Sequence, residues 1–216
     1  MPVNQLSRTT APAKTTELDY DIAIVGGGIV GATLACALKD SGLKIAIIET
    51  QIPAAAAAKK QAYAVTLLSG MILESIGVWE QILPQITTFE QISLCDGDYP
   101  GVVEFHRPDL GNTGKLPVPK EALGYVGEHR VMLSALQESL ARNPNFSWVC
   151  PAEVIEVKYL TDCAEIAVKQ NGETRTIRTR LLVAADGSRS QIRTAANITT
   201  RGWKYWQSCV AITIKA

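Results

Sequence analysis

The sequence has no excess of charge of either sign. Lys plus Arg and Asp plus Glu number 21 each among its 216 residues, so the formal net charge is zero. Proteins that bind nucleic acid through phosphate contacts carry clustered basic residues, and this balance argues against a nucleic-acid partner. Long apolar runs are also missing, since none approaches the roughly 20 residues that a membrane-spanning helix needs. We therefore expect a protein that is soluble or peripheral to a membrane.

Cysteine is scarce, and its spacing suits neither a zinc site nor a disulfide framework. The five cysteines are odd in number and contain no Cys-x-x-Cys pair, whereas structural zinc sites and small secreted domains depend on paired cysteines. We expect no metal site, a cytoplasmic location, and reduced thiols that are mostly buried. The N-terminal segment lacks the apolar core of a secretory signal. We expect residues 1–18 to form a flexible tail, with a transit peptide as the alternative.

A glycine-rich turn between an apolar strand and a helix is the most informative feature of the chain. Ile22–Val25 is a short continuous apolar run, which is typical of a parallel strand covered on both faces. Gly26, Gly28 and Gly31 follow in the pattern Gly-x-Gly-x-x-Gly. In such a turn the first glycine permits a sharp bend, the second lets backbone approach a pyrophosphate, and the third lets the helix pack close to the sheet.

The segment after this turn completes a dinucleotide-binding unit. A helix is expected at residues 29–40, with its free N–H groups and the positive end of its dipole directed at the phosphate site. A second strand at residues 45–48 ends in Glu49, where a carboxylate can accept hydrogen bonds from both ribose hydroxyls of an adenosine. An acid here disfavours the 2′-phosphate of NADP, so the pattern favours FAD or NAD. A purely structural glycine turn is the alternative.

The next part of the chain carries weaker signals. Residues 51–60 contain Pro53 and a run of alanines without an apolar stripe, which predicts a surface loop near the ligand site or a short helix. Apolar residues at near-helical spacing predict a buried helix within residues 65–78.

A change of pattern follows, from helical spacing to strands. Residues 86–105 read as two strands joined by turn residues at 96–101, which indicates a hairpin of a second sheet. Gly, Asn and Pro within residues 109–119 then predict a loop that returns to the first domain. An interleaved second domain is therefore expected.

A strongly periodic amphipathic helix follows the segment Gly127–Arg130 and ends at Asn143-Pro144. We interpret His129, at the start of this helix, as a surface or capping residue. Neither His129 nor His106 has a nucleophile or an acid as a partner at short spacing. The sequence therefore assigns no catalytic residue.

The last part of the chain predicts a run of strands and then an acid at a strand end. Strands are expected at residues 146–149, 154–159, 164–169 and 174–180, with Asn171-Gly172 as a hairpin turn. A further apolar strand at residues 181–185 leads into Asp186-Gly187, which places a carboxylate at the C-terminal edge of the sheet, where open α/β folds bind ligands. An ordinary turn before a helix capped by Ser188 or Ser190 is the alternative.

Three motifs in this order resemble the flavin-dependent aromatic hydroxylases, and most closely the ubiquinone-biosynthesis monooxygenase family. The motifs are GGGIVG with Glu49, GEHRVMLSAL, and LLVAADGSRSQIR. The glycine turn alone occurs in many nucleotide-binding proteins, whereas Asp-Gly-x-x-Ser-x-x-Arg, which ends at Arg193, is far more restricted. The resemblance covers nearly the whole chain from Tyr20 onward.

The resemblance implies particular roles for matching residues. The residues similar to the family's FAD-binding positions are Gly26, Gly27, Gly28, Gly31 and Glu49 for the ADP half, Arg130 for the flavin, and Asp186 and Gly187 for the flavin and the visiting nicotinamide nucleotide. The implied fold is α/β: a Rossmann-like FAD-binding domain, with a parallel sheet and a β-meander, plus the beginning of an interleaved substrate-domain sheet. Residues 19–85 and 120–200 would form the first domain, and residues 86–119 and 201–216 part of the second.

The implied activity is that of an FAD-dependent monooxygenase that hydroxylates a prenylated phenol in quinone biosynthesis. NADH or NADPH would supply the electrons and O2 the oxygen atom, while the flavin would carry the chemistry. A prenylated aromatic substrate implies peripheral contact with a membrane surface.

Two departures from the family pattern stand out. Where many relatives carry an arginine before the predicted buried helix, this chain has Lys59-Lys60-Gln61. The family's third signature, Gly-Asp-Ala-Ala-His or similar, is absent from the sequence. Residues 208–214 read as the first long strand of the substrate-domain sheet, which leads us to expect the N-terminal part of a longer enzyme.

Three other interpretations of the chain stay open. One is a nucleotide-binding module without turnover. Another is a flavin-dependent prenyl reductase, which shares both outer motifs. A plain NAD dehydrogenase accounts for the glycine turn and Glu49 but leaves Asp186 to Arg193 without a role.

Overall fold

The computed structural model describes residues 17–111 and 122–208. Its elements in chain order are β1 (Tyr20–Val25), α1 (Ile29–Ala37), β2 (Ile45–Ile48), α2 (Pro53–Ala57), β3 (Ala62–Thr66), α3 (Leu67–Ser75), α4 (Trp79–Ile82), β4 (Thr87–Phe89), β5 (Gln91–Asp96), β6 (Tyr99–His106), β7 (Gly124–Glu128), α5 (His129–Ala141), β8 (Phe146–Val149), β9 (Glu153–Tyr159), β10 (Ala164–Gln170), β11 (Glu173–Ala184) and α6 (Gln191–Ala195), with short 3-10 helices at Leu83–Gln85 and Arg107–Leu110.

A six-stranded sheet in the order β8-β2-β1-β11-β10-β9 forms the centre of the molecule. Strands β8, β2, β1 and β11 are parallel, and β10 and β9 continue the sheet as an antiparallel meander. The expected α/β class, with a parallel sheet and a β-meander, is confirmed. The strands expected separately at residues 174–180 and 181–185 are one strand, β11, which pairs with β10 through its first half and with β1 from Thr179 onward.

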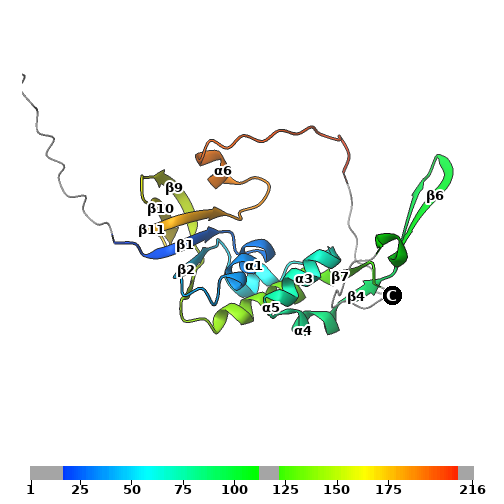
Figure 1. Cartoon of the computed structure of the whole chain (residues 1–216). Coiled ribbons are helices and arrows are strands. Elements are labelled where there is room, and N and C mark those ends of the chain that lie inside the picture. The colour runs from blue at the N-terminus through cyan, green and yellow to red at the C-terminus, as the bar shows by residue number, and fades with distance from the viewer. Residues whose placement is uncertain (1–16, 112–121, 209–216) are drawn as a thin grey trace, which may run out of the picture.

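Alternate side chains of the central strands enter two different cores. On one side, Ile22 and Ile24 pack in a cluster with helices α1, α3 and α5. On the other side, Ala23 and Val25 pack with Ile166, Val168 and Ile177 of the meander and with Ile192 of α6. This period-2 division explains why β1 and β2 are continuously apolar, because both of their faces are covered. Figure 1 shows α1, α3, α4 and α5 gathered on one side of the sheet, with α6 apart from them.

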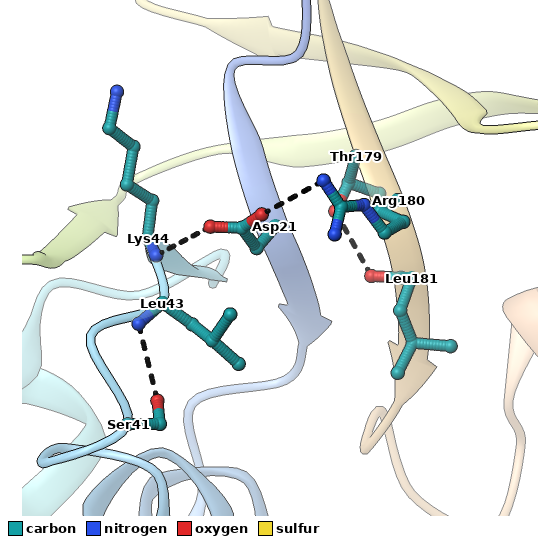
Figure 2. A network of polar contacts seen from close by, with 7 residues as sticks. All are labelled: Asp21, Ser41, Leu43, Lys44, Thr179, Arg180 and Leu181. Atoms are coloured by element: carbon teal, nitrogen blue, oxygen red, sulfur yellow. Dashed lines mark hydrogen bonds and ion pairs between the residues drawn. The ribbon is translucent and has the colours of Figure 1, made fainter.

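Polar contacts tie together the ends of the central strands opposite the glycine turn. The Asp21 carboxylate accepts a hydrogen bond from the Lys44 N–H at 2.9 Å and lies 3.6 Å from the Arg180 guanidinium, so it joins β1 to the start of β2 and to β11 (Figure 2). The Thr179 hydroxyl donates to the Leu181 carbonyl oxygen at 3.0 Å in the same network. These contacts fix the register of the strands whose other ends form the site.

Two smaller sheets lie on the helical side of the molecule. Strands β3, β7 and β4 form an antiparallel sheet, and β5 and β6 form a separate two-stranded hairpin. The hairpin extends away from the body, as Figure 1 shows at β6, and exposes apolar residues on both strands. The expected hairpin is confirmed, although Tyr99–Gly101, expected in its turn, belong to β6. Strand β7 went unrecognised in the sequence.

Several other expectations need correction. The buried helix expected at residues 65–78 is a strand followed by α3, and Leu68 and Ile72 are exposed. Helix α1 ends at Ala37, before the expected Asp40, whereas the alanine run does form the short helix α2. Of the four cysteines in the described residues, only Cys36 is buried, so the expectation of mostly buried thiols is wrong.

Some expectations concern residues outside the described ranges. They include residues 1–16 of the flexible tail expected at residues 1–18, most of the loop at residues 109–119, and all but the first residue of the strand expected at residues 208–214. Among the helices of the described residues, none is long and apolar enough to span a membrane. The assignment of residues to two domains stays a prediction.

Candidate functional site

A cavity of about 430 Å³ lies at the C-terminal ends of β1, β2 and β11. Its walls come from five separate places in the sequence: the glycine turn, the end of β2, Lys59, the start of β9, and the segment after β11. The residues that line it include Gly26, Gly28, Glu49, Lys59, Asp186 and Gly187. The structure therefore brings together residues of the two outer motifs, as the sequence predicted from the strand ends.

The first and third glycines of the turn are required by close packing. Gly26 has a φ of +107°, and a Cβ there would lie 2.2 Å from the Ala185 carbonyl oxygen. A Cβ at Gly31 would lie 2.0 Å from the Gly26 carbonyl oxygen. Since real Cβ atoms do not approach backbone this closely, these glycines let α1 pack against the turn and the turn against β11.

Gly28 differs from its neighbours because it faces open space. It is the N-cap residue of α1, with φ −73° and ψ −176°, and a Cβ there would meet no atom within 4 Å. The N–H groups of the first helical turn that follows have no intrahelical acceptor. An anion that approaches Gly28 can therefore reach those N–H groups and the positive end of the helix dipole.

Glu49 is held at the end of β2 by donors on both carboxylate oxygens. Its Oε2 accepts from the Gly27 N–H at 2.7 Å, and its Oε1 accepts from the Gln51 N–H at 3.0 Å and the Thr50 hydroxyl at 2.9 Å. Burial by itself raises the pKa of Glu49, but these hydrogen bonds outweigh it and leave the pKa below its ordinary value. The carboxylate is ionised at neutral pH and retains lone-pair capacity for further donors.

Gly27, which was expected to bind the cofactor, donates its N–H to the Glu49 carboxylate, and the expected cofactor contact stays a prediction. Its N–H is occupied by Glu49, and a Cβ there would lie 2.7 Å from the Trp148 ring. Gly27 is absent from the residues that line the cavity. Its geometry supports the orientation of Glu49.

Asp186 combines a structural contact with an unused acceptor. Its Oδ2 accepts from the Gln191 N–H at 2.8 Å at the start of α6, while its Oδ1 is buried and has no hydrogen-bond partner among the described residues. The neighbouring Gly187 has a φ of +90° and open space at its Cβ position. A buried acceptor without a donor is costly, so a ligand hydroxyl or N–H would satisfy Oδ1. Ser190 caps α6, as predicted, by accepting from the Arg193 N–H at 3.0 Å.

A second cavity of about 550 Å³ adjoins the first on the other side of the glycine turn. It lies between α1, β3, α3 and the start of α5, and its walls include Tyr63, Ile72, His129 and Met132. Gly28, Lys59 and Ala185 line both cavities. Lys59 is the charged residue that they share. The sequence placed its loop near the ligand site but assigned Lys59 no role.

The two residues at the start of α5 have very different environments. Arg130 is exposed, lies 3.7 Å from the Glu128 carboxylate, and lines neither cavity; its expected flavin contact stays a prediction. His129 is only 4% exposed, so its interpretation as a surface or capping residue is wrong. The sequence held a signal for this, because His129 shares the apolar helical face of Met132, Leu133 and Leu136.

The donors and acceptors of this site suit an organic ligand. Within the described ranges, no cluster of three His, Cys, Asp or Glu side chains could hold a metal ion. The first cavity is lined by a backbone turn that is open to an anion at Gly28, by the ionised carboxylate of Glu49, and by the buried Oδ1 of Asp186, which has no donor among the described residues. Such an arrangement can bind a ligand that carries a ribose, a diphosphate and further hydrogen-bond donors.

Comparison with known sequences identifies a family. The family described as "FAD binding domain" matches residues 19–216. An uncharacterized protein of Synechocystis sp. is 46% identical over 96% of this chain and 48% of its own length. The 3-demethoxyubiquinol 3-hydroxylase of Escherichia coli is 32% identical over 93% of this chain and 49% of its own. The chain thus spans about half the length of these curated relatives.

Comparison with solved structures agrees on the fold. The p-nitrophenol 4-monooxygenase PnpA of Pseudomonas putida superposes with a TM-score of 0.68 at 19% identity, over 84% of this chain and 44% of that protein. The flavin-dependent monooxygenase PieE, solved with FAD and substrate, has a TM-score of 0.67 at 18% identity, over 84% of this chain and 33% of that protein. At this identity the likeness establishes a shared fold.

Proposed function

The chain belongs to the FAD binding domain family, and from this premise we propose that it holds FAD in the cavity at the ends of β1, β2 and β11. The observation that carries the proposal is the placement of Gly28, Glu49 and Asp186 along one cavity. They offer, in turn, an anion-binding helix start, an ionised acceptor for ribose hydroxyls, and a buried acceptor that lacks a donor.

Each residue then has a defined task. Gly28 leaves room for the diphosphate at the start of α1, and Gly26 and Gly31 give the turn its shape. Glu49 accepts from the ribose, and Gly27 orients Glu49 through its N–H. Asp186 accepts a donor from the flavin half, with Gly187 leaving the space beside it. Arg130 would contact the flavin from the start of α5. These assignments fit FAD better than NAD, because they give Asp186 and Gly187 a role.

For the whole enzyme, we propose an FAD-dependent monooxygenase that hydroxylates a prenylated phenol in quinone biosynthesis. The proposal is supported by relatives named for ubiquinone hydroxylation in Escherichia coli and Rhodospirillum rubrum. Bound FAD supplies the redox chemistry, with NADH or NADPH as electron donor and O2 as co-substrate. The part of the chain described above binds and orients the cofactor. Residues 86–119 and 201–216 would contribute to the substrate domain, and a prenylated substrate would be met at a membrane surface.

The test uses the full-length protein as it is expressed. We expect it to purify with the visible absorption band of a bound flavin, to oxidise NADH or NADPH faster in the presence of a prenylated phenol, and to add one oxygen atom from isotope-labelled O2 to the ring. A protein without flavin would contradict the cofactor assignment. A flavoprotein that transfers hydride to the prenyl chain, with no oxygen incorporated, would contradict the monooxygenase assignment and support the reductase.

A further inference from the structure

His129 is a buried polar residue that lines the second cavity. It has no part in the proposed contacts with the cofactor. Its Nε2 lies 3.1 Å from the Ala56 carbonyl oxygen, and its Nδ1 lies 3.1 Å from the Tyr63 hydroxyl. A carbonyl oxygen only accepts, so Nε2 carries the proton and donates to Ala56. Nδ1 then accepts from the Tyr63 hydroxyl, and both ring nitrogens are satisfied in the neutral form.

The neutral form is also the one that the surroundings favour. The pKa of His129 lies below its ordinary value, mainly because the ring is buried. The hydrogen bond to Ala56 raises the pKa, whereas the nearby positive charge of Lys59 lowers it further. The ring is therefore uncharged at neutral pH. It acts as a rigid link with one donor and one acceptor.

This link joins the two ends of a single chain segment to helix α5. Ala56 lies in α2, before the exposed residues 58–61, and Tyr63 lies in β3, after them. The backbone N–H of His129 also donates to the Gln61 carbonyl oxygen at 2.7 Å. The segment between these anchors carries Lys59, the charged residue that lines both cavities where they meet at Gly28.

We propose that His129 is a positioning residue that holds Lys59 beside Gly28, where the Lys59 ammonium neutralises the diphosphate of bound FAD. The inference rests on the proposed FAD site. Lys59 makes the contact, and His129 acts through the segment that carries it. Lys59 and Gly28 line the same cavity as Glu49 and Asp186, so the Lys59 ammonium is suitably placed to reach a diphosphate that is bound at Gly28.

The test compares FAD affinity among variants of the same chain by titration of flavin fluorescence. Lys59→Met is expected to weaken FAD binding about tenfold, since hydrogen bonds to charged groups contribute about 1.5–3 kcal/mol, and to make binding less sensitive to salt. His129→Leu is expected to have the same two effects. Combining the two substitutions should add little, because both remove one interaction.

A conservative replacement separates positioning from general stability. His129→Gln keeps one donor and one acceptor, and we expect it to restore most of the affinity and the salt dependence. Tyr63→Phe removes the donor to Nδ1 and should give a partial loss; it replaces His129→Leu if that variant fails to fold. His106→Gln, at the exposed histidine of the chain, is the matched control and should bind as the unmodified chain does.

The outcomes separate this inference from the proposed function. Suppose that the unmodified chain binds FAD and that His129→Leu leaves the affinity and its salt dependence unchanged. This result would overturn the inference about His129 but not the proposed function. If His129→Leu does not fold, the same result in Tyr63→Phe has the same meaning. The inference would also be overturned if the losses of FAD affinity in Lys59→Met and His129→Leu were fully additive in the double variant, because His129 would then act independently of Lys59. An unmodified chain that binds no FAD would overturn the proposed function itself.

Discussion

Three donors fix the Glu49 carboxylate before any ligand arrives. The Gly27 and Gln51 N–H groups and the Thr50 hydroxyl hold it at the cavity wall. A group held in this way loses little conformational freedom when it binds, so preorganisation favours affinity. Because these contacts favour the charged form, the free energy of unfolding depends on whether Glu49 is ionised.

Glu49 should therefore contribute a pH dependence to unfolding. Its pKa in the folded chain lies below the ordinary value of 4.5, so its contribution is present above that value and is lost as the pH falls through the folded pKa. We expect the free energy of unfolding to drop more steeply in the unmodified chain than in Glu49→Gln between about pH 5 and pH 3. Urea titrations over this range measure the difference, and parallel pH profiles would contradict it.

Gly31 and Gly28 should respond to substitution in opposite ways. Gly31→Ala places a Cβ against the Gly26 carbonyl oxygen and should lower stability by about 1–3 kcal/mol, the usual cost of overpacking. Gly28→Ala meets open space in a backbone conformation that any residue adopts, and should leave the melting temperature nearly unchanged. Thermal unfolding of the two variants side by side tests this, and equal losses would show that the turn is arranged differently.

At the scale of elements, β11 shows what the sequence could and could not reveal. The mostly polar residues 174–180 and the apolar run of residues 181–185 read as two strands, because the first half of β11 lies in a meander and the second half lies beside β1. Periodicity reports the environment of a residue, so it cannot tell one strand in two environments from two strands. The glycine turn, Glu49 and Asp186 were predictable because they follow strands whose ends must meet.

Other elements were missed for equally physical reasons. Strand β7 is short and contains two glycines, and it is a strand only because β3 and β4 pair with it. The contacts of His129 with Ala56 and Tyr63 join residues more than 60 positions apart. No spacing rule could have found these contacts.

The turn between β10 and β11 allows a clean test at this scale. Asn171 and Gly172 both have positive φ, 53° and 87°, as a two-residue hairpin turn requires. Gly172→Ala should destabilise the chain by about 1 kcal/mol, since a Cβ disfavours this conformation. Asn171→Gly, the matched control, should be close to neutral. Urea denaturation compares them, and an unaffected Gly172→Ala would mean that the meander does not depend on this turn.

At the scale of the whole molecule, the fold places its chemistry at one edge of the sheet. Contacts around Asp21 secure the opposite strand ends, while two cavities meet at Gly28. One cavity is lined by Glu49 and Asp186, and the other by His129 and Tyr63. The proposed FAD contacts of Glu49 and Asp186 both lie in the first cavity, with the diphosphate at Gly28.

The proposed FAD site is tested by titration of the chain with FAD, followed by flavin fluorescence or calorimetry. We expect saturable binding of one FAD per chain, displacement of FAD by ADP, and loss of binding in Gly28→Val, which should fold normally but fills the space that the diphosphate needs. Absence of saturable binding in the unmodified chain, or FAD binding that Gly28→Val leaves unchanged, would contradict the proposed site.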